Sequence, residues 1–166
     1  MKEVMISIKP KWCDLIAQGK KTIEIRKRAP KLEPPFKCYI YCTLGGMSRN
    51  EMTKYIAPAA YGMVIGEFVC TEIIPIVVFN DGAIQHYMRD GLGDSCVPYD
   101  DIANYIGYGR TGYGWRMSEV VFYEEPRYIG EFKVEEHTEI WSFIKRLERP
   151  PQSWCYVIGG AEGCTN

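Results

Sequence analysis

The octapeptide GKKTIEIR at residues 19–26 carries the most information about both the fold and the function. Gly19 is typical of the left-handed residue that ends a helix, and it follows a helical apolar pattern over residues 11–18 that Pro10 opens. From residue 20 to 27 the pattern changes to the two-residue period of a strand. The stretch therefore predicts a helix that ends at a tight turn and leads directly into a strand.

The same stretch has side chains that could carry chemistry. A strand places Glu24 and Arg26 on one face, with Lys21 at the rim where the helix ends. A carboxylate and an ammonium paired in a cleft have shifted pKa values and support acid–base chemistry. Thr22 places a hydroxyl beside a potential base, which is the minimal form of a nucleophile pair. The alternative is an ion pair on a half-solvated strand, which contributes little.

Working outward from this stretch, the pattern predicts many short strands and few helices. Strands are expected over residues 4–8, 36–43, 61–79, 118–124, 128–134 and 154–158, and short helices near 83–90, 98–106 and 138–147. Residues 107–115 are expected to form a glycine- and aromatic-rich loop. Because strands and helices do not alternate regularly, the pattern favours a mixed α+β, mainly β fold, a small barrel with short peripheral helices.

Length and composition indicate one globular unit. We expect residues 1–158 of the 166-residue chain to form a single domain and residues 159–166 to be a mobile tail. Apolar residues make up 46% and charged residues 25%, which excludes a disordered chain. The apolar run at 73–79 is far shorter than the roughly 20 residues that span a bilayer, and the N-terminus lacks an apolar signal segment. We therefore expect a cytoplasmic protein without membrane contact.

Positive charge is concentrated near the N-terminus. Residues 1–31 contain nine Lys or Arg and three Asp or Glu, whereas the remainder contains 11 basic and 18 acidic residues. The net charge of −1 conceals this asymmetry. A basic segment on an acidic body creates a local positive potential where an anion can dock, although a solvated charged surface is the ordinary alternative.

The seven cysteines indicate buried thiols in a reducing compartment. Their number is odd, and no C-x-x-C pair is present. Cys38 and Cys42 share a face of the expected strand but lie about 13 Å apart, too far to share a metal. With only His86 and His137 as imidazole ligands, we predict neither a metal site nor another cofactor.

Several blocks along the chain resemble proteins with an ASCH domain, a family named for its homology to a transcription coactivator. The blocks are SIKP at 7–10, G-x-K-T-x-E-x-R at 19–26, YIY at 39–41, G-x-V-x-G-E-F at 62–68, GYGW at 112–115 and PPQSWCY at 150–156. They run in the family's order from about residue 4 to residue 158 and are most similar to a small bacterial and prophage branch. The segment 134–149 is longer than expected for that branch, and we interpret it as an added helix.

The resemblance implies a PUA-like β-barrel whose cleft holds RNA, a nucleotide or a modified nucleoside. Lys21 and Glu24 would lie in this cleft. The other residues expected to bind the ligand are Lys9, Arg26, Tyr41, Glu67, Trp115, Ser153 and Trp154. Cations would contact phosphates, and the three aromatic side chains would stack on bases, although tyrosine and tryptophan are more often core residues.

A hydrolase is the alternative function. Bacterial 4-acetylcytidine amidohydrolases resemble the same segment but carry G-x-K-T-x-T-x-R, in which the lysine and the second threonine are implicated in removing an acetyl group. Here Lys21 matches the lysine, and Glu24 stands in place of that threonine. In an enzyme acting on a modified nucleoside or on RNA, the catalytic residues would be Lys21, Glu24 and Thr22. Either Thr22 or a water activated by Glu24 would attack, with Glu67 as a candidate third group.

A third possibility is an accessory protein that binds another protein through its aromatic surface.

Overall fold

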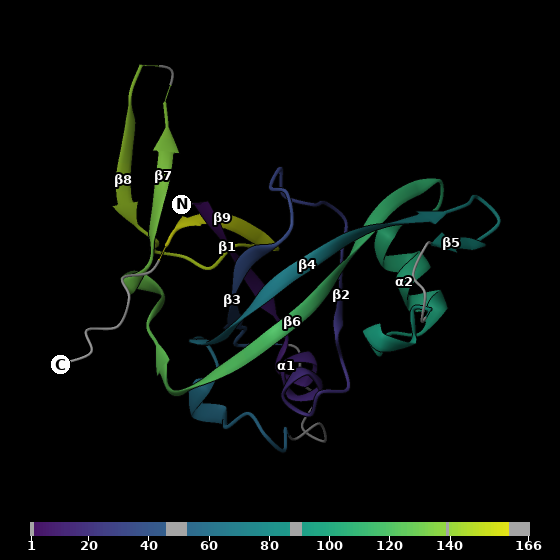
Figure 1. The fold of residues 1–166 in the computed structure, drawn as a ribbon, viewed down its shortest axis with the longest axis horizontal. Helices are drawn as coiled ribbons and strands as arrows, with labels where there is room; N and C mark the ends of the chain where they lie inside the picture. Colours follow the sequence, from purple (N-terminus) through teal and green to yellow (C-terminus); the bar gives the residue numbers. More distant parts are fainter. Residues whose placement is uncertain (1, 46–52, 87–90, 139, 160–166) are drawn as a thin grey trace.

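The computed structural model describes residues 2–45, 53–86, 91–138 and 140–159. Within these ranges the chain forms a nine-stranded mixed sheet with two α-helices (Figure 1). The strands are β1 (Lys2–Ile8), β2 (Ile23–Arg26), β3 (Phe36–Cys42), β4 (Val64–Val78), β5 (Ile84–His86), β6 (Arg110–Arg127), β7 (Lys133–His137), β8 (Ser142–Arg146) and β9 (Trp154–Ile158). The helices are α1 (Pro10–Ala17) and α2 (Tyr99–Ile106), together with the short 3-10 helices η1 (Pro58–Ala60), η2 (Gly93–Ser95) and η3 (Ile129–Glu131).

The sheet has the order β2-β6-β4-β3-β1-β9-β7-β8, and β5 pairs with one end of β4. The β1–β3 pair is parallel and the other pairs are antiparallel. The longest strands, β4 and β6, lie side by side across the whole molecule (Figure 1). Helix α2 lies at one end of this long pair, and the β7–β8 hairpin projects from the other end of the molecule.

The prediction of a closed barrel is wrong. In the described part of the chain, the two ends of the sheet, β2 and β8, do not pair with each other. One reason is that the β7–β8 hairpin extends away from the body instead of returning toward β2 (Figure 1). Strand β2 contacts β1 through a side chain instead, because Arg26 Nη2 donates a hydrogen bond to the Ser7 carbonyl oxygen at 2.6 Å.

The predicted helix-to-strand junction is confirmed. Helix α1 begins at Pro10, and Gly19 has the left-handed φ of +69° that the turn requires. The strands expected at 4–8, 36–43 and 154–158 correspond to β1, β3 and β9, and the helix expected at 98–106 corresponds to α2.

Four other local predictions are wrong. The strand expected at 128–134 contains the 3-10 helix η3, and β7 begins only at Lys133. Residues 107–115 are not all loop, because β6 begins at Arg110 and Gly112 lies within it. A Cβ at Gly112 would lie 2.6 Å from the Ile106 side chain, so this glycine permits close packing of α2 on the strand. The segment 138–147, predicted as a helix, contains strand β8, which pairs with β7. The segment 83–90, also predicted as a helix, contains strand β5, and its residues 87–90 lie outside the described ranges.

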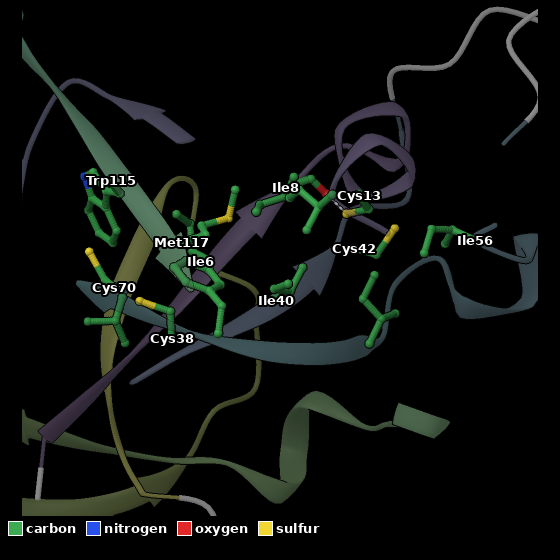
Figure 2. Close-up of a cluster of buried hydrophobic side chains, with 14 of the residues drawn as sticks. Ile6, Ile8, Cys13, Cys38, Ile40, Cys42, Ile56, Cys70, Trp115 and Met117 are labelled. Carbon is green, nitrogen blue, oxygen red and sulfur yellow. Dashed lines mark hydrogen bonds between the residues drawn. The ribbon is translucent and has the colours of Figure 1, made fainter. Parts of the chain in front are cut away.

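The buried core next to α1 is rich in thiols. Cys13 on α1 and Cys42 on β3 lie close together in this cluster, and Cys38 and Cys70 occupy its other end (Figure 2). The six cysteines that the structure describes are free thiols. Within the described ranges no three His, Cys, Asp or Glu side chains form a group able to hold a metal, and no helix is long and apolar enough to cross a membrane.

The tail expected over residues 159–166 lies, except for Gly159, outside the described residues.

Candidate functional site

A pocket of about 440 Å³ opens beside strand β2, on the side where the sheet fails to close. Its walls come from β1, α1, β2, α2 and the loop before β9, so segments from both ends of the chain contribute. This volume falls within the range typical of sites for small molecules. The incomplete closure of the sheet therefore leaves room for a ligand.

Three charged side chains form the floor of this pocket. Lys21 is 2% exposed and Glu24 4% exposed. Lys21 Nζ lies 3.1 Å from Glu24 Oε2, and Arg26 Nη1 lies 3.0 Å from Glu24 Oε1. Two cations and one carboxylate leave the floor with a formal charge of +1.

The local fold places Lys21 at the start of this floor. At the end of α1 the backbone N–H groups of Lys20 and Lys21 both donate to the Leu15 carbonyl, which fixes the turn. The next N–H, that of Thr22, donates to the Asp94 carbonyl in η2. The chain therefore enters β2 with the Lys21 side chain directed into the interior, next to η2.

The Lys21 ammonium contacts three oxygen atoms. Nζ donates hydrogen bonds to the carbonyl oxygens of Ile23 at 2.8 Å and Ser95 at 2.6 Å, and its third partner is the Glu24 carboxylate. Two of the contacts of Nζ are therefore hydrogen bonds to backbone carbonyls, and the third is an ion pair with the carboxylate. In this arrangement Lys21 Nζ ties β2 to η2 and lies beside the Glu24 carboxylate.

Two polar atoms of the floor lack hydrogen-bond partners among the described residues, Glu24 Oε2 and Arg26 Nε. Oε2 is close enough to Lys21 Nζ for an ion pair, but the angles are not those of a hydrogen bond, so that contact is mainly Coulombic. Buried polar atoms without partners are uncommon, and a bound ligand or water is one explanation for them. The floor therefore keeps unused hydrogen-bonding capacity.

The rim of the pocket combines cations and aromatic rings. Lys11 Nζ lies 4.4 Å from the centre of the Trp12 ring, and Lys21 Nζ lies 5.2 Å from the same ring. Lys9 and Tyr105 also line the pocket, and both are exposed. Such a rim can attract an anion and offer flat surfaces to a planar group.

A second pocket, of about 610 Å³, adjoins the first. The two share Tyr105, Gln152 and Ser153 in their linings. The second pocket adds Lys27, Arg28 and Trp154. Across both linings the described residues include six basic and two acidic side chains, so the combined groove is positively charged.

Six of the ten residues predicted for the site line these pockets. The first pocket contains Lys9, Lys21, Glu24, Arg26 and Ser153, and the second contains Ser153 and Trp154. The predicted proximity of Lys21 and Glu24 is found, and the solvated ion pair considered as the alternative is not, because both side chains are buried.

The other four predicted residues lie outside both linings. Trp115 is fully buried, with its ring centre 6.1 Å from that of Phe36. Tyr41 packs in another buried cluster, where burial raises the pKa of its hydroxyl. Thr22 is half-buried and joins neighbouring segments through its backbone.

Glu67, the fourth, belongs to a separate polar cluster on β4. Its Oε1 lies 3.0 Å from Lys37 Nζ, and its Oε2 accepts a hydrogen bond of 2.6 Å from the Tyr123 hydroxyl. Burial tends to raise the pKa of this carboxyl, but the Tyr123 hydrogen bond and the Lys37 charge outweigh burial and hold the pKa below its usual value. Lys37 and Tyr123 therefore account for the charged state and position of the Glu67 carboxylate, and no ligand is needed to explain them.

Several residues of the pocket were not predicted, among them Trp12, Asp101, Tyr105 and Gln152. Asp101 and Tyr105 are four residues apart on α2 and therefore share a helical face, which was the available sequence signal. No local pattern indicates that this face turns toward Lys21.

The fold and the site define the class of protein: a mainly β, α+β domain with a cation-lined pocket beside an open sheet. The chain belongs to the ASCH-domain family, because the family's sequence model matches residues 6–150. This family has a PUA-like fold and is often linked to RNA binding.

Solved structures support the same fold. The ASCH protein of Zymomonas mobilis matches with a TM-score of 0.52 and 18% identity, over 93% of this chain and 86% of that one. A variant of that protein with one tyrosine replaced by phenylalanine matches with a TM-score of 0.53 and 18% identity, over 94% and 90%. A variant with one serine replaced by alanine matches with a TM-score of 0.57 and 17% identity, over 93% and 87%. A search of curated proteins gave no significant match.

Proposed function

We propose that this protein binds RNA or a nucleotide in the pocket above Lys21, Glu24 and Arg26. The observation that carries the proposal is the combination of a buried, hydrogen-bonding floor of formal charge +1 with a rim of cations and aromatic rings. Such a pocket matches a nucleotide, which has a planar polar base and an anionic phosphate.

Each part of the pocket has a role in this proposal. The guanidinium of Arg26 and the carboxylate of Glu24 present donors and acceptors to the edge of a base. The rings of Trp12 and Tyr105 offer faces for stacking, and the ammonium groups of the exposed Lys9 and the half-buried Lys11 contact phosphate. Lys21 maintains the charge and position of Glu24 from below.

The test is a titration of a random single-stranded RNA pool at about 50 and 200 mM salt. Affinity should fall steeply with salt, and Lys9→Ala with Lys11→Ala should weaken binding and reduce the slope of log affinity against log salt by about one to two. Lys133→Ala with Lys145→Ala is the matched control, because it removes the same charge from the distant β7–β8 hairpin. Absence of binding at low salt would refute the proposal.

Hydrolysis of a modified nucleoside or of RNA is the second candidate. One observation favours it: Glu24 lines the pocket and its Oε2 has no hydrogen-bond partner among the described residues. Lys21 Nζ donates to two backbone carbonyls and Thr22 does not line the pocket, so attack by a water activated by Glu24 is the route we propose.

The hydrolase proposal is tested by incubating the protein with acylated cytidines and with RNA and separating the products by chromatography. Turnover that Glu24→Gln abolishes would support catalysis at this site. Absence of turnover, or turnover that survives Glu24→Gln, would refute it.

A further inference from the structure

The second pocket has a composition that a single bound nucleotide does not explain. Its charged lining in the described part of the chain consists of Lys27 and Arg28, without an acidic side chain. The first pocket, in contrast, includes Glu24 and Asp101. The groove therefore changes from a mixed polar floor to a purely cationic section, and the polar side chains Gln152 and Ser153 lie at the boundary.

Lys27 and Arg28 follow directly after β2, and both side chains are exposed. Lys27 Nζ lies 5.2 Å from the centre of the Tyr105 ring, and Tyr105 lines both pockets. This contact holds a cation at the junction between the pockets. A phosphate attached to a nucleotide in the first pocket would meet positive charge at this point.

Trp154 forms a preorganised aromatic wall of the second pocket. Its Nε1 donates a hydrogen bond of 3.1 Å to the Arg28 carbonyl oxygen. Its ring centre lies 5.4 Å from that of Tyr156 and 5.9 Å from that of Trp115, so neighbouring rings support it. A ring that is already fixed loses little conformational entropy when a base stacks on it.

We infer that the groove accommodates a single-stranded oligonucleotide of at least two nucleotides. The first base occupies the pocket above Glu24 and Arg26, the linking phosphate contacts Lys27 and Arg28, and the second base stacks on Trp154. This inference rests on the proposed binding function. It adds that the preferred ligand is an oligonucleotide, because a free nucleoside or mononucleotide leaves the second pocket empty.

A nucleoside triphosphate is the competing ligand, because its phosphates could also contact Lys27 and Arg28. It has no second base for Trp154. The two ligands therefore differ in their need for the ring, whereas both need the two cations.

The experiment measures the affinities of nucleoside 5′-monophosphates, nucleoside triphosphates and random RNA dinucleotides by direct titration. The wild-type protein should bind dinucleotides about tenfold more tightly than monophosphates, the gain expected from one stacked base and one phosphate. Lys27→Ala with Arg28→Ala, and separately Trp154→Leu, should reduce this ratio to about two. Lys133→Ala with Arg146→Ala, which removes the same charges from the hairpin, should leave the ratio unchanged.

Each unfavourable result has a distinct meaning. Equal affinity for dinucleotides and monophosphates would overturn the inference and leave the proposed binding function intact. If triphosphates bind as tightly as dinucleotides, and Trp154→Leu does not change the ratio of dinucleotide to monophosphate affinity, the proposed binding of a second base on Trp154 would be overturned. No binding of any of the three ligands would refute both proposals.

Discussion

Lys21 and Glu24 form a buried ion pair three residues apart, with Nζ 3.1 Å from Oε2. The pair forms because the turn after α1 directs Lys21 inward immediately before the strand that carries Glu24. Buried ion pairs add little stability compared with apolar residues of similar size, but removal of one partner is costly. Removing either Lys21 or Glu24 should therefore destabilise the protein and alter the pocket that both residues line.

Replacing Lys21 with methionine should destabilise the protein by about 3–5 kcal/mol, because it leaves the Glu24 carboxylate without one of its cations and two buried carbonyls without donors. Urea unfolding of Lys21→Met and of the exposed control Lys27→Met measures this cost. The control should change the free energy of unfolding by less than about 0.5 kcal/mol. Equal effects of the two substitutions would contradict the buried position of Lys21.

Glu67 should make stability depend on pH in acid. Despite burial, Tyr123 and Lys37 hold the pKa of Glu67 below its usual value in the folded protein. A lowered folded pKa contributes stability above the unfolded pKa of about 4.3, and this contribution is lost as the pH falls through the folded value. The stability difference between wild type and Glu67→Gln should therefore shrink between about pH 6 and about pH 3 in urea titrations. A difference that is constant or grows in acid would contradict this assignment.

Gly66→Ala should destabilise the protein by about 3 kcal/mol. A Cβ at this position would lie 2.3 Å from the Val121 carbonyl oxygen, so β4 and β6 would have to separate where the ladder is irregular. Gly45→Ala is the matched control, because among the described residues, chain neighbours aside, a Cβ there meets no atom within 4 Å. Thermal unfolding measures the stability of the two variants. If Gly66→Ala loses no more stability than Gly45→Ala, the sheet can relax around the added methyl group and the prediction is wrong.

The thiols should differ in reactivity according to burial. Burial raises the pKa of Cys38 well above its usual value, that of Cys70 to about 12 and that of Cys155 to about 11. Because the thiolate is the reactive form, these three should react slowly with iodoacetamide at about pH 8. The partly exposed Cys96 should be alkylated first among the cysteines that the structure describes, as measured by peptide mass spectrometry. Labelling of Cys38 as fast as Cys96 would contradict the packing of the core.

Local signals predicted the β1–α1–β2 unit well. Pro10 opens α1, Gly19 ends it with a positive φ, and the alternation of Ile23 and Ile25 places both in one apolar cluster. Each of these signals depends only on residues that are close together in the sequence, so the local pattern is sufficient to predict them. The same signals placed Lys21 and Glu24 near each other, but the sequence pattern left open whether the two side chains touch and are buried.

The failed predictions depend on contacts between distant segments. Ile140, Trp141 and Ile144 have a spacing compatible with a helix, but Ile144 pairs across the hairpin with Glu135, and the tertiary pairing decides the structure. The barrel failed to close because of where this hairpin projects, which no local pattern encodes. Likewise, aromatic composition could not indicate that Trp115 is buried while Tyr105 lines the pocket.

The most direct test of the central claim, that the pocket above Lys21, Glu24 and Arg26 holds the ligand, is an amide chemical-shift titration with a random single-stranded RNA pool. The account predicts that the shifts of Ile25, Tyr105 and Ser153, which surround the pocket, move in a saturable way, while that of Tyr123 stays constant. Shifts confined to the β7–β8 hairpin, or no shifts at all, would contradict it.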